Sequence, residues 1–306
     1  MLQIIIFSFN RAIQLDALLA SIIRYWEMPE YSLDVVYNTS SKMFERGYEL
    51  LKEKYAGNNS ITFHKESKYI NQYRLKEVIN PYNLKRLWKY PYLRRPKTDF
   101  RYLTINIMEK SKAENVAFLT DDSVFVNKVN IPVNVFSWLA ESPTSRQFSL
   151  RIGEGMNNQP DKGIVKDNGL LSWNMKGNNL DTNWGYQFSV DGHIYNKASI
   201  LKLFRSYVFC NPNSLEGYLC NIIRRKNWFN EAKAFSETRL LSFPINMVQQ
   251  VEDNESMGVS TEMMNDYYIK GYGLEYMMPT KIESFQVYPD EIYFVKGQEK
   301  LVVKTK

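Results

Sequence analysis

Apolar and polar residues alternate in blocks along the first part of the chain, and the blocks have the lengths of strands and helices. Residues 3–9 form a nearly continuous apolar run, which is typical of a strand covered on both faces. Apolar side chains at helical spacing then predict a helix over 13–25. The same pattern predicts a strand over 33–37, a helix over 42–55 and a strand over 61–64. This order predicts a doubly wound α/β fold of the nucleotide-binding kind.

The rest of the chain continues this fold class less regularly. A helix over 99–112 leads into an apolar strand over 115–119, and a second apolar stretch covers 124–126. The segment 153–183 is rich in Gly, Asn and Asp and predicts a loop or lid. Ser214 ends a turn-forming Asn-Pro-Asn-Ser sequence and is the expected N-cap of a helix. The other expected elements are strands over 147–152, 186–190 and 194–195, and helices over 197–206, 215–226 and 260–270.

Electrostatic charge narrows the classes of partner. The 306 residues carry a net charge of +6, which favours anionic partners. Residues 85–97 are rich in basic and aromatic side chains. This stretch is either a solvated face or a patch that binds phosphates or a membrane surface. No zinc-finger spacing or RNA-recognition motif accompanies it, so nucleic acid is not an expected partner. The stretch consists of Lys85, Arg86, Lys89, Arg94, Arg95 and Lys97, with Trp88, Tyr90 and Tyr92 between them.

Cysteine content and the N-terminus indicate a reducing compartment. Cys210 and Cys220 are too few for a disulfide framework. The apolar run at the N-terminus is too short for a signal peptide and is followed at once by Asn10 and Arg11. No stretch reaches the roughly 18 apolar residues of a membrane span. We therefore expect a cytoplasmic protein that is soluble or peripheral on the inner face of a membrane.

Two common phosphate-binding sequences are missing. Neither a G-x-G-x-x-G fingerprint nor a G-x-x-x-x-G-K loop follows the first predicted strand. NAD and FAD are therefore not expected cofactors. A fold of this kind that binds phosphate without a glycine-rich loop needs a metal ion or basic side chains to neutralise the charge.

Asp121 and Asp122 are the sharpest chemical signal in the sequence. They follow the predicted strand 115–119, and ligands of open α/β sheets bind at the carboxyl ends of strands. Two adjacent carboxylates repel one another unless a cation or a proton is shared between them. A hard ion such as Mg²⁺ or Mn²⁺ binds carboxylates and bridges them to a diphosphate. The alternative is that Asp121 caps a turn and Asp122 is solvated.

Glu216 and Asp191 are candidates for acid–base chemistry. Glu216 either gains from the dipole of the predicted helix or serves as a general base for an acceptor hydroxyl. Asp191 is a second candidate acid, base or ligand, and His193 follows two residues later. A lone histidine is more often a hydrogen-bonded structural residue than a ligand.

Four motifs carry a resemblance to a known family, and their order along the chain matters more than any one of them. Residues 7–22 read Phe-Ser-Phe-Asn-Arg-Ala-x-Gln-Leu-x-x-Leu-Leu-x-Ser-Ile, and residues 118–123 read Phe-Leu-Thr-Asp-Asp-Ser. Residues 211–217 and 244–249 supply the other two motifs. Together they resemble bacterial glycosyltransferases with the GT-A fold, whose Asp-x-Asp metal motif stands here in an Asp-Asp form. The resemblance implies an α/β, Rossmann-type fold with a central, mostly parallel mixed sheet flanked by helices.

The resemblance also implies a division of labour in a single domain. Residues 1–126 would form the nucleotide-binding half, and residues 127–306 the acceptor-binding half with a C-terminal extension. The implied reaction moves a sugar from a nucleoside diphosphate sugar, with UDP favoured, to a hydroxyl of a glycan or glycolipid. Enzymes of this kind take part in the synthesis of cell-surface polysaccharides.

Roles for single residues follow from the same resemblance. Mn²⁺ or Mg²⁺ would bind chiefly Asp122, with Asp121 nearer the ribose. Glu216 matches the position of the catalytic base in inverting members, and Asp191 is the alternative base. The expected nucleotide contacts are Ser8, Asn10, Arg11, Asn38, Lys97, Arg101 and Asp121.

Two other classes of protein stay open at this point. A sugar-1-phosphate nucleotidyltransferase could share the fold but would carry a Gly-rich loop with Arg or Lys after the first strand, and that loop is missing. A non-catalytic nucleotide-sugar-binding protein would keep the fold and lack turnover.

Overall fold

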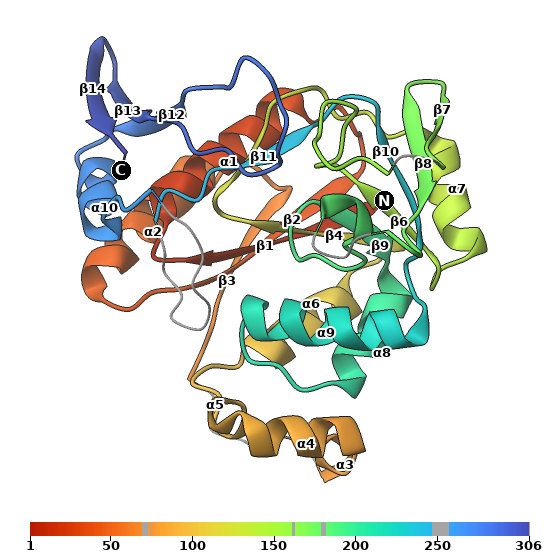
Figure 1. Cartoon of the computed structure of the whole chain (residues 1–306). Helices are drawn as coiled ribbons and strands as arrows, with labels where there is room; N and C mark the ends of the chain where they lie inside the picture. The colour runs from red at the N-terminus through yellow and green to blue at the C-terminus, as the bar shows by residue number, and fades with distance from the viewer. Residues whose placement is uncertain (69–72, 74, 161–162, 179–181, 247–256, 306) are drawn as a thin grey trace.

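A mixed β-sheet crosses the centre of the molecule and carries helices on both faces (Figure 1). The computed structural model describes residues 1–68, 73, 75–160, 163–178, 182–246 and 257–305. Within these residues, nine strands form the sheet in the order β3-β2-β1-β4-β9-β6-β10-β8-β7. The predicted fold class, an α/β fold with a central mixed sheet flanked by helices, is confirmed.

The N-terminal strands form the parallel half of the sheet. β1 (Leu2–Phe9) lies between β2 (Tyr31–Asn38) and β4 (Asn115–Thr120), and β3 (Ile61–Lys65) pairs with β2. All three pairings are parallel, as expected for strands connected through helices. The sequence pattern locates these strands well because β1 and β4 are apolar runs, and β2 and β3 are short segments that carry apolar residues between polar turns.

Neighbouring residues of β1 enter two separate apolar cores, because side chains alternate across a strand. Ile6 belongs to the core that includes α1 (Ala12–Tyr25) and α2 (Lys42–Tyr55). Phe7 belongs to the core that includes α6 (Phe100–Lys110). Helices cover both faces of the strand, which explains why its sequence shows no alternation of polar and apolar residues.

The second half of the sheet is built around β9 (His193–Asn196), which runs antiparallel to both β4 and β6 (Arg146–Ser149). β10 (Glu231–Phe235) pairs parallel with β6. β8 (Leu170–Asn174) and β7 (Val165–Asp167) complete this edge as antiparallel strands. Along the sheet from β3, β9 is therefore the first strand that runs opposite to the strand before it.

The prediction that 153–183 is a loop or lid is wrong in part, because β7 and β8 form a hairpin within it. β8 is held by β10, a strand that the sequence pattern did not reveal. Residues 161–162 and 179–181 of this segment lie outside the described residues.

The predicted strand over 186–190 is also wrong. Its backbone N–H groups bind side chains where a strand would bind a neighbouring strand. Ser189 N donates to Tyr195 Oη (2.9 Å), and Val190 N donates to Glu216 Oε2 (2.9 Å). The segment is therefore an irregular loop pinned in place from two sides.

Two helices after β9 cover the same face of the sheet as α6. α8 (Lys197–Ser206) spans the predicted residues, whereas α9 (Pro212–Lys226) begins earlier than predicted. Its N-cap is Asn211 and not Ser214: Asn211 Oδ1 accepts a hydrogen bond from Ser214 N (2.7 Å), and Ser214 Oγ accepts one from Asn211 N (3.1 Å). This reciprocal pair is a capping box, and Ser214 is its third helical residue.

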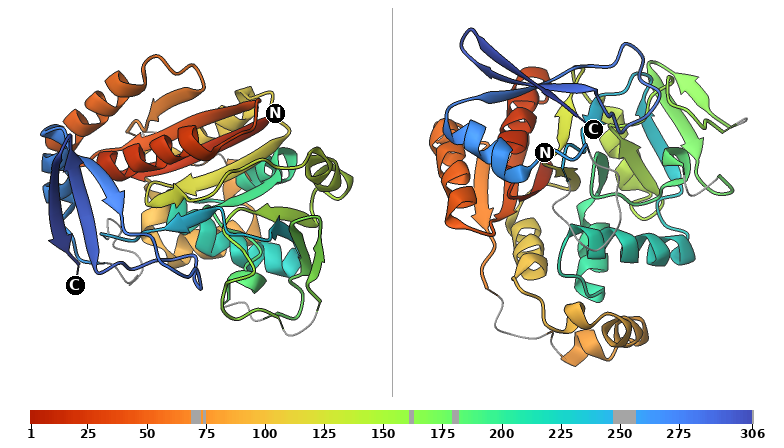
Figure 2. Two further views of the ribbon diagram at one scale, coloured as in Figure 1. Left: turned by 90° about the horizontal axis from the view of Figure 1, so that it is seen from above. Right: turned by 60° about the vertical axis from the view of Figure 1, so that its left-hand side comes forward.

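The C-terminal section packs beside α1 and α2 (Figure 2). It contains α10 and a small antiparallel sheet of three strands in the order β12-β13-β14. No helix in the described part of the chain is both long and apolar enough to span a bilayer. The elements not yet placed are β5 (Ser123–Phe125), α7 (Val133–Glu141), β11 (Leu240–Ser242), α10 (Thr261–Ile269), β12 (Gly273–Tyr276), β13 (Glu291–Lys296) and β14 (Glu299–Lys304).

Three short helices between β3 and α6 project from one end of the molecule (Figure 1). They are α3 (Leu75–Val78), α4 (Pro81–Lys89) and α5 (Pro91–Arg94), and we refer to them together as the α3–α5 unit. A small apolar cluster, which contains Leu87 and Val208, joins the unit to the segment after α8. The basic and aromatic stretch of the sequence lies in this unit and in the residues that follow it.

Candidate active site

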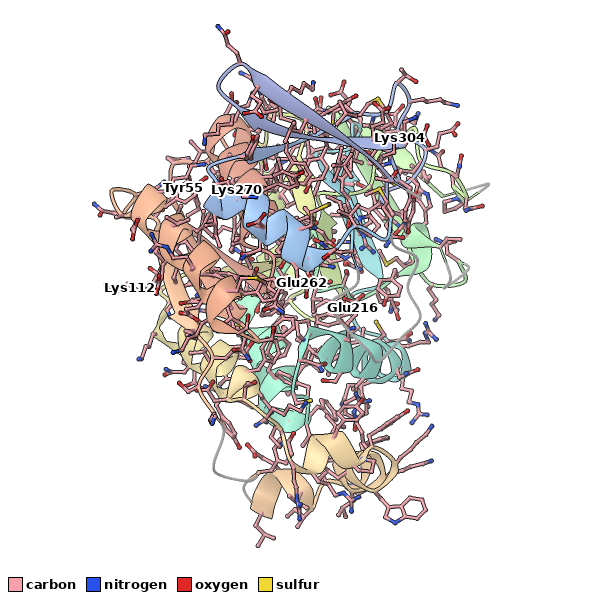
Figure 3. All side chains as sticks on the ribbon, turned by 90° about the vertical axis from the view of Figure 1, so that its left-hand side faces the viewer. Tyr55, Lys112, Glu216, Glu262, Lys270 and Lys304 are labelled. Atoms are coloured by element: carbon pink, nitrogen blue, oxygen red, sulfur yellow. The ribbon has the colours of Figure 1, made fainter. Side chains whose placement is uncertain are left out.

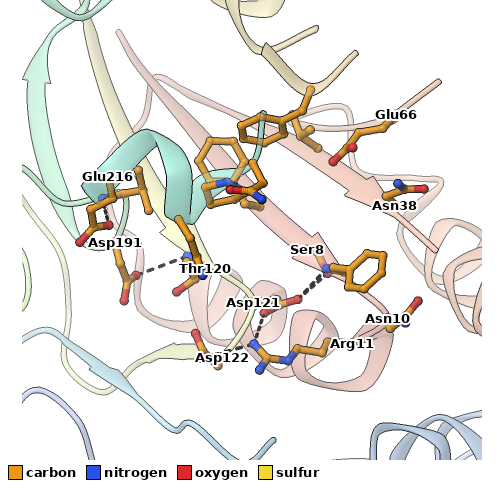
Figure 4. Close-up of a pocket in the computed structure, with 18 of the residues that line it drawn as sticks. Ser8, Asn10, Arg11, Asn38, Glu66, Thr120, Asp121, Asp122, Asp191 and Glu216 are labelled. Carbon is orange, nitrogen blue, oxygen red and sulfur yellow. Dashed lines mark hydrogen bonds and ion pairs between the residues drawn. The ribbon is translucent and has the colours of Figure 1, made fainter. Parts of the chain in front are cut away.

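A cleft of about 1020 Å³ opens at the carboxyl ends of the parallel strands. Phe9, Asn38 and Thr120 are the last residues of β1, β2 and β4, and all three line it. The loop before β9 and the start of α9 contribute Asp191 and Glu216 to the cleft. Figure 4 shows these polar side chains converging from both halves of the sheet. The cleft lies where open α/β sheets bind their ligands.

Asp121 is the centre of a buried hydrogen-bond network on one side of the cleft (Figure 4). Its Oδ2 accepts hydrogen bonds from Ser8 Oγ (2.8 Å) and Phe9 N (3.1 Å), and its Oδ1 accepts one from Arg11 Nη1 (3.0 Å). The Ser8 hydroxyl also contacts Tyr48 Oη (2.5 Å). Burial raises the pKa of Asp121 to about 6, although Arg11 opposes this shift. Both carboxylate oxygens of Asp121 are thus engaged by donors.

Arg11 connects the Asp-Asp motif to the segment after β11. Its Nε donates to Asn246 Oδ1 (2.6 Å), its Nη2 donates to the carbonyl of Asn246, and its Nη1 lies 3.5 Å from Asp122 Oδ2. Burial opposes the charge of Arg11, but the charges of Asp121 and Asp122 outweigh it and raise the pKa of Arg11. Residues 247–249, the end of the predicted 244–249 motif, lie outside the described residues.

Asn10 joins the turns that follow β1 and β2. Its φ is 59°, a left-handed conformation that asparagine adopts more readily than most residues. Its side-chain amide donates to Ser40 Oγ (2.8 Å) and accepts from Ser40 N (2.9 Å). Asn10, Asn38 and Ser40 all line the cleft. The two turns therefore form one polar edge, as the sequence-based assignment of Asn10 and Asn38 requires.

Asp191 enters the cleft from the second half of the sheet. Its Oδ1 accepts hydrogen bonds from Ser123 Oγ (2.9 Å) and Thr120 N (3.3 Å). Burial, assisted by the charge of Asp122, raises the pKa of Asp191 to about 7. The next residue, Gly192, has a φ of 76°, which allows the chain to turn from the cleft into β9. The fold thus brings Asp191 to the same cleft as Asp122, although the two residues are 69 positions apart in the sequence.

Glu216 lies near the start of α9, on the Asp191 side of the cleft (Figure 4). Its Oε2 accepts the hydrogen bond from Val190 N, so it fixes the loop before β9. His193 is fully buried in the sheet, with Nδ1 3.1 Å from Tyr195 Oη, and burial holds its pKa well below the usual value. It is a neutral structural residue in this arrangement.

Lys97 and Arg101, two basic residues before β4 that are predicted to reach the nucleotide, lie in different places. Lys97 lines the cleft. Arg101 does not line the cleft, because its guanidinium is buried among residues of the α3–α5 unit and the end of α8. There it forms an ion pair with Glu77 (3.1 Å) and donates to the carbonyls of Tyr207 (3.0 Å) and Phe204 (2.9 Å). Arg101 fastens the α3–α5 unit to the end of α8.

Three residues near the cleft have no signature in the sequence. Arg151 is buried: its Nη1 donates to Ser189 Oγ (3.2 Å), and its Nε has no hydrogen-bond partner in the described residues. Glu66 lines the cleft near Asn38, and burial raises its pKa to about 7. The Tyr276 hydroxyl is shielded from solvent, and burial together with the charges of the Asp-Asp motif raises its pKa. They come from segments far apart in the sequence, so only the fold reveals them.

The donor atoms at the Asp-Asp motif fit a divalent ion only in part. Asp121 accepts three side-chain or backbone hydrogen bonds, whereas the one polar contact of the Asp122 side chain among the described residues is with Arg11, at 3.5 Å. No cluster of three or more His, Cys, Asp or Glu suited to a metal occurs within the described residues. Mg²⁺-type sites often use one or two carboxylates and complete their coordination with water and substrate phosphates. The arrangement therefore fits an ion held by Asp122 together with a bound diphosphate.

The known structures that this chain resembles share only its backbone fold. No protein-family model matches the chain, and no curated protein matches it. The solved structures similar to it include a mannosyltransferase and a protein solved with a nucleotide sugar.

The individual structures are as follows. S. aureus TarS, residues 1–349, is 15% identical with a TM-score of 0.46, over 79% of this chain and 60% of that chain. Its complex with UDP-GlcNAc is 15% identical with a TM-score of 0.44, over 78% and 57%. The mannosyltransferase PcManGT from Pyrobaculum calidifontis, solved with GDP-Man and Mn²⁺, is 14% identical with a TM-score of 0.31, over 50% and 36%. The chain thus spans about three fifths of the TarS fragment.

Asp191 should make the stability of the protein depend on pH. Its folded pKa of about 7 lies above the ordinary Asp value, so the folded state retains a proton that the unfolded state loses between about pH 4 and pH 7. The free energy of unfolding should therefore fall across this range as pH rises, by up to about 4 kcal/mol from this group. Asp191→Asn removes the effect.

Thermal unfolding without divalent cations measures this dependence. Asp191→Asn should have a higher Tm than the wild type at pH 8 and a similar Tm at pH 5. Asp167→Asn, the same change at an exposed position on β7, serves as the control. A Tm difference between Asp191→Asn and wild type that does not change with pH would contradict a raised pKa of the buried Asp191 carboxyl.

Proposed function

We propose that this chain is a glycosyltransferase of the hexosyltransferase type. It would move a sugar from a nucleoside diphosphate sugar to a hydroxyl of a glycan or glycolipid. One observation carries the proposal: Asp122 and Asp191 line the same cleft at the carboxyl ends of the parallel strands. Such a pair suits a cation-bound diphosphate on one side and a proton acceptor on the other. Residues 1–126 would bind the nucleotide, and residues 127–306 the acceptor.

The nucleotide would lie along the edge formed by the turns after β1 and β2. Asn10 and Asn38 present side-chain amides there, and Lys97 offers a cation to the phosphates. Ser8 and Arg11 would act indirectly, by holding Asp121 in a fixed orientation near the ribose. UDP is the favoured nucleotide of the donor.

A divalent cation, Mn²⁺ or Mg²⁺, would be held by Asp122 and by the donor diphosphate. When bound, the ion would supply positive charge that stabilises the diphosphate as it leaves. The Arg11 guanidinium, 3.5 Å from Asp122, adds a second positive charge from the protein itself. Asp121 would not be a direct ligand while its two oxygens accept hydrogen bonds from Ser8, Phe9 and Arg11.

Asp191 is the better placed of the two candidate bases. Its pKa of about 7 is close to neutral pH, where a general base is most effective. Glu216 holds the loop before β9 through Val190 N, whereas the hydrogen bonds that Asp191 accepts from Thr120 and Ser123 use only its Oδ1. Asp191 would take the proton of the acceptor hydroxyl while the hydroxyl oxygen forms a bond to C1 of the sugar. The bond from C1 to the diphosphate oxygen breaks, and its electron pair leaves with the nucleoside diphosphate.

Thermal unfolding with nucleoside diphosphates tests the proposal. UDP together with Mn²⁺, at about 100 times its dissociation constant, should add about 2.7 kcal/mol of stability and raise the Tm by several degrees. UDP without Mn²⁺ should have a smaller effect. The absence of any shift with UDP, GDP or ADP in the presence of Mn²⁺ would overturn the proposal. Assays with UDP-hexoses then assign the base: Asp191→Asn should lose turnover, and Glu216→Gln should retain it.

A further inference from the structure

The helix α4 has two faces with different roles. Its inner face packs on the body of the molecule: Asn83 is buried, and the Arg86 guanidinium lies 3.8 Å above the Tyr218 ring and donates to the carbonyl of Ser214 (2.6 Å). Its outer face carries Leu84, which is one turn before Trp88. The outer residues are therefore not required to hold the helix in place.

The outer face of the α3–α5 unit is unusually apolar for an exposed surface. Trp88 is 82% exposed, Leu75 is 78% exposed and Ile79 is 62% exposed. Leu84 and Trp88 border a groove of about 670 Å³ that Val78 also lines. Single exposed apolar residues are ordinary, but a cluster of large ones marks an interaction surface. We call Leu75, Ile79, Leu84 and Trp88 the apolar tip.

The surroundings of the apolar tip are strongly basic. Residues 75–97 contain seven Lys and Arg and one acidic residue, Glu77, so this segment accounts for the whole net charge of +6. Glu77 is itself buried and paired with Arg101. The exposed cations form no ion pair within the described residues, and they are Lys85, Lys89, Arg94, Arg95 and Lys97.

We propose that the α3–α5 unit docks on a lipid bilayer that carries anionic headgroups. Tryptophan favours the boundary between water and acyl chains, and aliphatic side chains gain by entering it. Lysine and arginine next to the surface are attracted by anionic lipids. Trp88 and its aliphatic neighbours supply the apolar contribution to docking, and Lys85 and Lys89 supply the electrostatic contribution. Figure 3 shows the unit at one end of the molecule, with side chains directed outward.

Charge argues against other occupants of this surface. Two copies of the chain that met through this unit would bring two sets of unpaired cations together, which is unfavourable. A nucleic acid would satisfy the cations but would leave Leu75, Ile79 and Leu84 exposed. An anionic bilayer satisfies both the cations and the apolar side chains.

The docking surface adjoins the cleft. Arg95 borders the groove and also lines the cleft, and Tyr92 and Lys97 line the cleft as well. Docking would therefore place the cleft beside the membrane surface. The docking proposal does not depend on catalysis. Taken with the proposed function, it implies that the acceptor is linked to a lipid.

Vesicle flotation at 0.1 M NaCl tests the docking. The full chain should float with vesicles of phosphatidylcholine containing 30% phosphatidylglycerol and should float much less with pure phosphatidylcholine. Binding should fall sharply at 0.5 M NaCl, since salt screens the attraction to headgroups. The double variant Lys85→Glu/Lys89→Glu should bind at least about tenfold more weakly. Trp88→Ser should weaken binding roughly tenfold through the apolar contribution.

A matched charge control separates docking from a general effect of net charge. Lys110→Glu/Lys112→Glu makes the same change in charge at exposed positions on the body of the molecule, and Figure 3 shows Lys112 away from the unit. This control variant should retain most of the binding to anionic vesicles, and all variants should have the wild-type Tm.

Three results would overturn the docking proposal. The first is a wild-type chain that does not float with anionic vesicles. The second is an equal loss of binding in both double variants. The third is self-association that Trp88→Ser abolishes while vesicle binding is absent, because the apolar tip would then join two copies. None of these results bears on the thermal-shift test with UDP and Mn²⁺, so the two proposals can fail separately.

Discussion

An Asp122→Asn variant should release UDP from a UDP-hexose at least about a thousandfold more slowly, in kcat/KM, than the wild type with Mn²⁺ present. Asp122 is the carboxylate of the Asp-Asp motif that is available to an ion, because its one ion pair in the part of the chain that the structure describes is the 3.5 Å approach of Arg11. A metal ion at a leaving diphosphate contributes several kcal/mol to transition-state stabilisation. A loss of about 4 kcal/mol corresponds to about a thousandfold in rate.

The stability of the same variant separates a catalytic loss from a folding defect. Asp122→Asn should have a Tm no lower than the wild type without metal, since the change removes one long contact and relieves the repulsion from Asp191. Asp167→Asn on β7 should keep the wild-type rate. Wild-type kcat/KM in Asp122→Asn would show that this carboxylate does not hold a cation during the reaction.

Replacement of Arg11 by Met should have the largest effect on stability. Arg11 is buried and stands between Asp121 and Asp122 while it holds Asn246 with two further donors. Removing one partner of a buried ion pair typically costs about 3–5 kcal/mol because it leaves an uncompensated charge. Thermal unfolding at pH 7.5 should show a Tm lower by the order of 10 °C.

Added Mn²⁺ should restore part of the stability lost in Arg11→Met, because a divalent cation can take the place of the missing charge between the carboxylates. Mn²⁺ should raise the Tm of this variant more than it raises that of the wild type. Arg24→Met, the same change at an exposed position in the last turn of α1, controls for the loss of an arginine. An equal response to Mn²⁺ in Arg11→Met and wild type would contradict the idea that the two carboxylates attract a cation.

The parallel half of the fold could be predicted because it depends on local patterns. β1 and β4 are largely apolar runs, and β2 and β3 carry apolar residues between polar ones. Helices such as α2 (Lys42–Tyr55) and α8 (Lys197–Ser206) show apolar residues at helical spacing. The turns after β1 and β2 lie at the carboxyl ends of strands, so the joint position of Asn10 and Asn38 also followed from the fold class.

The second half could not be predicted in the same way, because its structure depends on contacts between distant residues. The loop 186–190 has the composition of a strand, but Glu216 and Tyr195 bind its N–H groups. Arg101 lies outside the cleft lining, and the sequence does not show which face of α6 it occupies. Arg151 belongs to no motif, and its place beside Ser189 appears only when the chain is folded.

Arg95 borders both the groove of the α3–α5 unit and the cleft, and this shared position has a thermodynamic consequence. One guanidinium cannot fully neutralise a headgroup phosphate and a donor phosphate at the same time. If both proposals hold, occupancy of either side weakens the other through this side chain, and linkage requires the two penalties to be equal. Release of the nucleoside diphosphate would then strengthen binding to the bilayer, and tighter binding to the bilayer would favour that release.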